Sequence, residues 1–370
     1  MLIVTIIVFI LILSVLVLIH EAGHFITAKL FGIKVEEFGF GLPPRAFGKK
    51  IGETIYSINW LPIGGFVKLY GEDEAGSGSV KVSKKQVRGD LKRAFFARPV
   101  WQRFIVVFAG VFMNFLLAVV IISFLFSAVG VPIPGNKVNV DIVVKNSPAD
   151  KAGIKVGDTV SSINGTAITS TTQLIDITRM HLGQKLTLKL QTRNSKLETV
   201  EVTPRKVYPS NEGPMGVAIS QSYVTKKYPW YQAPFVGTKE AFHETDLIIN
   251  GLVMIVVQIF TKGSVPSDVA GPVGIAELTG TVVSIGPTAV LSFLSLLSLN
   301  LAIVNILPVP ALDGGRLLFI LIEGIFRKKV NQRIEGYAHA IGMAILLGLI
   351  ALITLHDLFR RFTGQPLIPK

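Results

Sequence analysis

Three ionisable residues lie within the five-residue stretch HEAGH, residues 20–24. On a helix, His20 and His24 are four residues apart and therefore share one face. Two imidazole nitrogens at this spacing can bind one zinc ion, and Glu21 beside them can take a proton from metal-bound water. In a soluble helix the same five letters are as often a chance match. The pattern therefore indicates zinc hydrolase chemistry only if its surroundings support it.

The residues before HEAGH supply that support. Residues 1–19 form an apolar run that is long enough to cross a bilayer. The run lacks a positively charged start and a small-residue cleavage site, so we interpret it as a retained transmembrane helix and not as a signal peptide. Ionisable side chains at membrane depth need partners and are functional by default. Because a helix rises about 1.5 Å per residue, His20 falls near the end of the span.

A catalytic zinc site normally has three protein ligands, so two histidines are not enough. The stretch NILPVPALDGGR places Asp313 directly after a later apolar run. Pro308 and Pro310 are expected to interrupt the helix there, and Gly314 and Gly315 to let the backbone turn. On its own, Asp313 is better explained by a helix-ending turn that it caps. Paired with the histidine motif, it is predicted to be the third ligand.

The composition is that of a polytopic α-helical membrane protein. Half of the 370 residues are hydrophobic, and without cysteine the chain has neither disulfides nor thiolate chemistry. Basic loops beside a membrane explain the net charge of +13 without nucleic acid. Three further runs, residues 104–130, 289–307 and 337–355, are long enough to span. The shorter run 247–260 is expected to be an interfacial helix, with a fifth span as the alternative.

Basic residues gather in two loops, 32–99 and 308–336, which the positive-inside rule places in the cytoplasm. With four spans, both termini and residues 131–287 then lie outside. The first and third spans run in the same direction, so their motifs meet near the cytoplasmic side. Arg360 and Arg361 fall on the outer side, which contradicts the rule locally.

The chain resembles the site-2 protease family of intramembrane zinc metalloproteases, in particular its bacterial RseP-type group. The resemblance is carried by two motifs, each at the end of an apolar run: HEAGH and NILPVPALDGG. The resemblance covers essentially the whole chain, through GFG at 39–41, LPIGGFVKL at 61–69, AGVFMN at 109–114 and GPVGIA at 271–276. One departure is Val111, where many relatives have proline, and it is expected to adjust packing only.

By position, the resemblance implies that His20, His24 and Asp313 are zinc ligands and that Glu21 is the catalytic acid and base. It also implies residues that shape the substrate path, namely Asn305, Pro308, Pro310, Gly65 and Phe66. The segment from Gly39 to Val67 resembles the family's membrane-associated β-hairpin, which can pair with an extended substrate. Such pairing would stabilise a transmembrane segment that has been unwound for cleavage.

Residues 131–207 alternate apolar and polar positions, which is typical of a small β-rich module outside the membrane. Their stretch SPADKAGIKVGDTVSSINGT resembles a bacterial PDZ domain. The module either filters or gates substrates or is a steric plug without a ligand. A single such module resembles the shortened form of the family, as in Gram-positive bacteria.

The expected organisation is a protease core in two halves, 1–130 and 288–370, with the PDZ-like module at 131–207 and a linker with an interfacial helix at 208–287. The resemblance implies an endopeptidase of the bacterial plasma membrane that cleaves single-span proteins trimmed beforehand, such as anti-sigma factors or leftover signal peptides. The alternative is a non-catalytic adaptor that binds peptides through the module, which the intact Glu21 disfavours. The other histidines, His181, His243, His339 and His356, are expected to take no part in catalysis.

Overall fold

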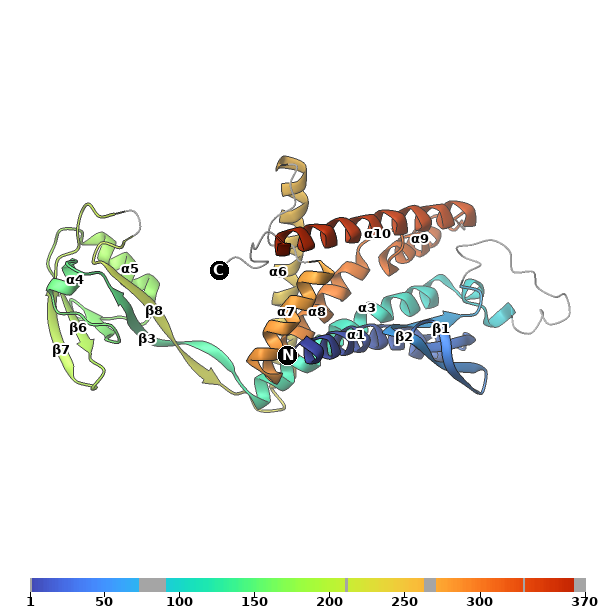
Figure 1. Cartoon of the computed structure of the whole chain (residues 1–370), viewed down its shortest axis with the longest axis horizontal. Coiled ribbons are helices and arrows are strands. Elements are labelled where there is room, and N and C mark those ends of the chain that lie inside the picture. The colour runs from blue at the N-terminus through green and yellow to red at the C-terminus, as the bar shows by residue number, and fades with distance from the viewer. Residues whose placement is uncertain (1, 73–90, 210–211, 263–270, 329, 363–370) are drawn as a thin grey trace. The chain divides into compact units, whose positions relative to one another are not determined.

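The computed structural model describes residues 2–72, 91–209, 212–262, 271–328 and 330–362. Among them, four helices are long and apolar enough to cross a membrane. These are α1 (Leu2–Leu30), α3 (Val100–Ala128), α8 (Pro287–Ile306) and α10 (Gln332–Phe362) (Figure 1). They coincide with the four apolar runs expected from the sequence. The first helix continues without a break through HEAGH, so both histidines lie on regular helix.

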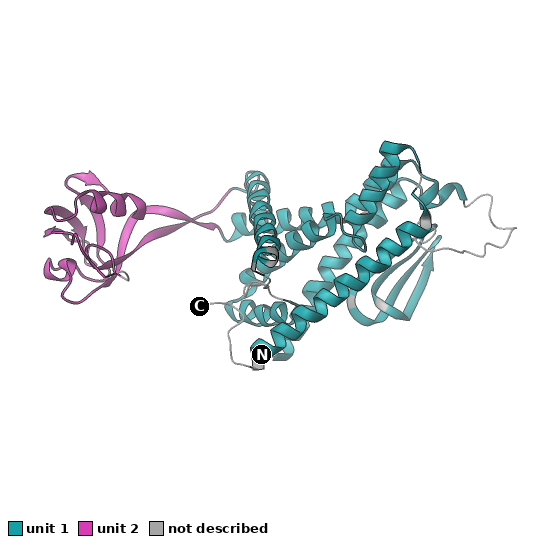
Figure 2. Cartoon of the chain, turned by 90° about the horizontal axis from the view of Figure 1, so that it is seen from above, with its two compact units in different colours: residues 1–129, 229–370 teal, residues 130–228 magenta. Residues whose placement is uncertain are grey.

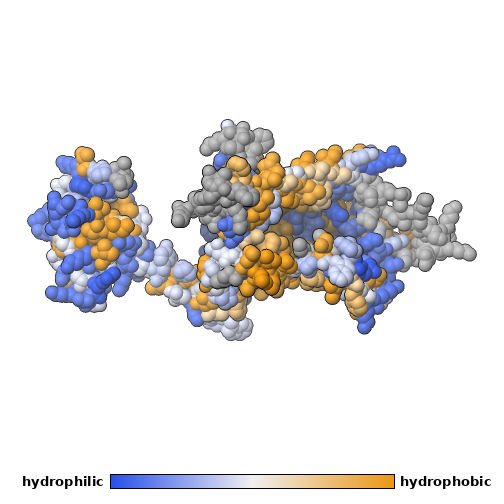
Figure 3. Space-filling view, viewed as in Figure 1, coloured by the Kyte–Doolittle hydropathy of each residue, from blue (hydrophilic) through white to orange (hydrophobic). Residues whose placement is uncertain are grey.

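The chain forms two compact units, residues 1–129 with 229–370, and residues 130–228 (Figure 2). In the first unit, α1 packs along α3, and α3 packs along α8. On the face shown in Figure 3, apolar side chains cover much of the first unit, whereas hydrophilic residues dominate the second unit. Only 6% of the most apolar window of α10 is buried. Such a surface is suited to lipid and not to water.

Two long antiparallel strands, β1 (Val35–Ile51) and β2 (Thr54–Leu69), form a curled sheet in the first unit. Phe38 pairs with Val67 on one side and with Tyr56 on the other. The first half of β1 therefore lies between the two halves of β2. Residues 65–69 form an edge of this sheet, and the expected hairpin between Gly39 and Val67 extends to residues 35–69. Two short 3-10 helices, η2 (Leu91–Arg93) and η3 (Phe95–Ala97), precede α3.

Three helices outside the expected spans complete the first unit, namely α6 (Ala233–Lys262), α7 (Pro272–Ile285) and α9 (Asp313–Phe326). The expected interfacial helix at 247–260 is the second half of α6, which begins at Ala233. Charged residues in the first half of α6 interrupt any apolar run there. Its packing on α3 stabilises the helix instead, since Ala241 is fully buried and Phe242 contacts Phe115.

The expected cytoplasmic loop 308–336 also contains a helix, α9. One face of α9 carries Leu317 and Ile320, which are buried in the same cluster as Val106 of α3 and Ala28 of α1. Basic residues around α9 favour a loop in a hydropathy reading, but this buried stripe is typical of an amphipathic helix. The core of the unit therefore extends to the helix that begins with Asp313.

The second unit is a six-stranded sheet with two helices. Its elements are β3 (Val131–Val143), α4 (Pro148–Lys151), β4 (Thr159–Ile163), β5 (Thr166–Ala167), α5 (Thr171–Met180), β6 (Leu186–Gln191), β7 (Leu197–Val202) and β8 (Val217–Lys226). The strand order is β7-β6-β4-β3-β8, with β5 beside β4. Leu186, Leu188 and Leu190 alternate inward into its core. Because β8 pairs with β3, the module extends past residue 207, the boundary expected from the sequence.

Candidate metal centre

The end of α1 and the start of α9 bring three candidate ligands together. The Nε2 atoms of His20 and His24 lie 3.2 Å apart. Oδ2 of Asp313 lies 2.9 Å from Nε2 of His20 and 3.3 Å from Nε2 of His24. Within the described residues these three can offer one ligand atom each, all within 4.8 Å of one another. Both histidines are buried, so the cluster is shielded from bulk water.

Two glycines let α1 and α3 approach closely at this cluster. A Cβ at Gly23, in the middle of HEAGH, would lie 2.4 Å from the carbonyl oxygen of Ala109. A Cβ at Gly110 would lie 2.4 Å from Nε2 of His24. Neither distance is compatible with a side chain, so glycine at both positions makes room for the imidazoles.

Hydrogen bonds on the far side of each ring orient the histidines. Nδ1 of His24 lies 2.8 Å from the carbonyl oxygen of Val106, to which it can only donate. Nδ1 therefore carries a proton, and in the neutral ring the Nε2 lone pair would face the cluster. Nδ1 of His20 lies 3.3 Å from Nδ2 of Asn114, whose Oδ1 is buried without a hydrogen-bond partner. Turning this amide by 180° would let Oδ1 accept a proton from Nδ1, which gives His20 the same tautomer.

The donor set fits a zinc ion. Oδ2 of Asp313 is buried and has no hydrogen-bond partner, although two ring nitrogens lie close to it. Burial raises the pKa of Asp313, but the neighbouring His20 and His24 lower it by more. The resulting pKa of Asp313 is well below its ordinary value. In the neutral rings, two imidazole lone pairs would face a carboxylate, and a cation bound among the three groups would relieve their repulsion. Two nitrogens and one oxygen are ligands that zinc accepts.

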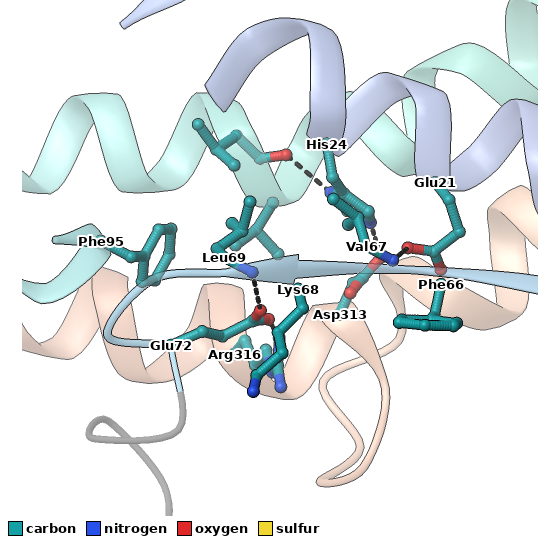
Figure 4. Close-up of a pocket in the computed structure, with 12 residues that line it drawn as sticks. Glu21, His24, Phe66, Val67, Lys68, Leu69, Glu72, Phe95, Asp313 and Arg316 are labelled. Atoms are coloured by element: carbon teal, nitrogen blue, oxygen red, sulfur yellow. Dashed lines mark hydrogen bonds and ion pairs between the residues drawn. The ribbon is translucent and has the colours of Figure 1, made fainter. Parts of the chain in front are cut away.

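Glu21 lies beside the cluster and faces a cavity. Its Oε2 accepts a hydrogen bond from the backbone N–H of Val67, at 2.9 Å (Figure 4). The cavity has a volume of about 350 Å³ and is lined by α1, α3, α9 and residues 66–69 of β2. A carboxylate, a candidate metal centre and the edge of a sheet therefore meet at one cavity, an arrangement typical of a metalloprotease.

Comparison with known proteins decides the family. The model of Peptidase family M50 matches residues 8–349. The chain belongs to this family, the site-2 proteases. The regulator of sigma-W protease RasP of Bacillus subtilis is 31% identical to it, over 97% of this chain and 99% of that protein. A Clostridium perfringens protein assigned to the zinc metalloproteases is 36% identical, over 93% of this chain and 96% of that protein. Membership makes the chain a zinc metalloprotease.

In this site-2 protease, the residues expected along the substrate path do not all reach the cavity. Phe66 lines it, and Nδ2 of Asn305 lies 3.5 Å from Nε2 of His20. Gly65, Pro308 and Pro310 are not among the lining residues. A path that includes these three would have to run beyond the cavity itself.

The glycines after Asp313 have a different role from the one expected. Neither Gly314 nor Gly315 is among the described residues with a left-handed backbone, and both lie inside α9. A Cβ on Gly314 would lie 2.0 Å from the carbonyl oxygen of Leu307, and one on Gly315 would lie 2.5 Å from that of Val309. They allow the first turn of α9 to pack on the preceding loop. Asp313 is the first residue of α9 and Leu312 occupies the N-cap position, so Asp313 is not the cap residue that the alternative expected.

Two charged residues in the cavity of this site-2 protease were not found from the sequence. Oε2 of Glu72 accepts a hydrogen bond from the backbone N–H of Leu69, at 3.3 Å, and Glu72 forms an ion pair with Arg316 (Figure 4). This pair joins the end of β2 to the first turn of α9. Single charges far apart in a chain give no signal of such a pair.

Proposed function

We propose that the protein is an intramembrane zinc endopeptidase in which His20, His24 and Asp313 hold the zinc ion. The observation that carries this proposal is the meeting of three candidate ligands, His20, His24 and Asp313, beside a cavity that Glu21 lines. Zinc, when bound, supplies a Lewis acid that polarises the peptide carbonyl and makes water more acidic. Glu21 takes the proton of the attacking water and returns it to the leaving nitrogen.

The edge formed by residues 65–69 is the proposed docking site for the substrate backbone. Along an edge strand, every second residue has its backbone N–H and C=O directed away from the sheet. Val67 is such a residue, because its N–H donates a hydrogen bond to Glu21. A transmembrane helix has all its amides engaged, so it must unwind before cleavage. A strand added at this edge re-engages those amides and holds the scissile bond beside the metal centre.

The substrates we propose are single-span membrane proteins trimmed beforehand, such as anti-sigma factors or remnant signal peptides. The name of the Bacillus subtilis relative, a regulator of sigma-W protease, supports the first class. The protein is proposed to lie in the bacterial plasma membrane, with the metal centre near the cytoplasmic side and the PDZ-like unit outside. That unit is proposed to filter substrates by size. Its removal, from residue 131 to 227 so that both β3 and β8 are taken out, should allow untrimmed substrates to be cut.

Turnover of a model transmembrane substrate by purified protein tests the proposal. Glu21→Gln should keep its zinc, yet cleavage should fall at least ~10²-fold, the scale of lost general acid–base catalysis. Asp176→Asn, the same change at an exposed position of the second unit, is the matched control and should cleave normally. Binding without any turnover by the unaltered, zinc-loaded protein would favour a non-catalytic adaptor instead.

A further inference from the structure

The last apolar helix, α10, contacts the loop that carries Asp313. The backbone N–H of Ala311 donates a hydrogen bond to Nδ1 of His339, at 2.9 Å. The His339 ring is partly buried and packs against Phe319 of α9, with ring centroids 5.8 Å apart. His339, for which the sequence indicates no function, therefore contacts Ala311, two residues before the candidate ligand Asp313.

The loop contains a strained turn. The backbone N–H of Leu312 donates to the carbonyl oxygen of Val309, at 3.2 Å, which closes a four-residue turn with Pro310 and Ala311 at its centre. Ala311 has a φ of 85°, in the left-handed region. A turn with proline second and a positive φ third normally has glycine at the third position. Alanine is strained there and persists only if its surroundings hold it.

Helix α10 supplies those surroundings at both central residues of the turn. His339 accepts a hydrogen bond from the backbone N–H of Ala311. Gly342 lies three residues further along α10, on the same face of the helix. A Cβ on Gly342 would lie 2.3 Å from the carbonyl oxygen of Pro310. The turn is therefore held by one hydrogen bond and one close backbone contact, both from α10.

We propose that His339 is a positioning residue for Asp313. By accepting the Ala311 N–H, it holds residues 309–312 in the left-handed turn and so keeps the Asp313 carboxylate beside His20 and His24. The inference rests on the proposed function, in which Asp313 is a zinc ligand. Without the acceptor, the turn relaxes to conformations that do not strain Ala311, and the carboxylate leaves the histidines.

Zinc affinity of the full-length protein in detergent, measured by competition with a chromogenic chelator, tests this role. His339→Ala should weaken zinc binding at least ~10-fold, the scale at which outer partners of metal ligands act. His339→Asn should bind more tightly than His339→Ala, because its amide oxygen can accept the same hydrogen bond. Adding Ala311→Gly to His339→Ala should also restore affinity, because glycine adopts the left-handed turn without strain. His356→Ala, an exposed histidine on the same helix, is the matched control.

Failure of the inference is distinguishable from failure of the proposed function. Zinc binding that survives Asp313→Ala would overturn the proposed ligand set whatever His339 does. Loss of zinc in Asp313→Ala, together with normal affinity in His339→Ala, would overturn the positioning role alone. The same role is overturned if His339→Ala weakens binding and neither His339→Asn nor Ala311→Gly restores it, since the effect would then come from packing.

Discussion

The carboxylate of Glu21 and the backbone amide of Val67 are joined by a hydrogen bond of 2.9 Å. The residue proposed to transfer the proton is therefore held by the edge of the sheet proposed to receive the substrate. A substrate strand that pairs with the same N–H has to take it from Glu21. Binding of an extended substrate and release of the carboxylate for chemistry are coupled in this arrangement.

This relationship predicts the effect of Val67→Pro. The Val67 N–H points to Glu21 and not to β1, so proline removes this N–H without removing a hydrogen bond of the sheet. Edge positions of a sheet tolerate proline. We expect a folded, zinc-loaded protein whose cleavage rate falls at least ~10-fold, the scale of one lost hydrogen bond to a charged group. Cleavage of a model transmembrane substrate measures this. Normal cleavage would show that neither Glu21 nor the substrate needs this amide.

The ligand assignment predicts the metal content of the protein. Purified protein should contain about one zinc per chain, because the described residues offer one cluster of three converging ligands. The double change His20→Ala, His24→Ala should abolish binding, since one carboxylate cannot hold zinc alone. Elemental analysis of the two proteins, purified side by side, checks the prediction. Unchanged zinc in the double variant would mean that the metal lies elsewhere.

The contact between α1 and α3 predicts a strong effect of a single methyl group. Gly110→Ala places a Cβ 2.4 Å from Nε2 of His24, so the ring or the helix must move. We expect zinc affinity to fall by at least ~10-fold, as when a ligand loses its orientation. Gly251→Ala is the matched control, because nothing lies within 4 Å of a Cβ there and alanine favours a helix. Equal zinc affinities in the two variants would contradict the packing argument.

A charged cluster at the turn between β1 and β2 predicts an acid-sensitive contribution to stability. Arg93 and Lys29 donate hydrogen bonds to Glu53 and lower its pKa from 4.5 to about 2. Because the folded-state pKa lies below the unfolded-state value, this stabilisation is present above about pH 4.5 and is lost as the pH falls toward 2. Glu53→Gln should lower the melting temperature by about 2 °C at pH 7, the scale of a surface ion pair.

Thermal unfolding in detergent at pH 7 and at pH 3 measures this contribution. The difference between Glu53→Gln and the unaltered protein should shrink at the lower pH, because Glu53 is then almost fully protonated in the unfolded state and must lose that proton to form its ion pairs on folding. Glu198→Gln in the second unit serves as a control, since its contact with Lys196 is long at 3.9 Å. A difference that stays constant with pH would show that the carboxylate charge is not what stabilises this region.

Much of the fold could be predicted because it depends on local properties of the chain. Hydropathy over about 20 residues is enough to find a span, so all four long apolar helices were predicted. Two of them, α1 (Leu2–Leu30) and α10 (Gln332–Phe362), extend well beyond the predicted runs 1–19 and 337–355. The helical repeat places His20 and His24 on one face whatever the rest of the chain does. The resemblance, and a topology in which two spans share a direction, then pointed to Asp313 as their neighbour, and the structure brings the three together.

Other features depend on contacts between distant segments, and only the tertiary structure decided them. The helix α9 and the first half of α6 owe their stability to packing on α3, which composition does not reveal. Gly314 and Gly315 were expected to turn the backbone, but the nearby carbonyl groups of residues 307–309 explain them better. The contact between Ala311 and His339 combines a strained backbone with a hydrogen-bond acceptor from another helix. Neither residue is unusual in the sequence, because the strain and its relief exist only once α10 lies against the loop.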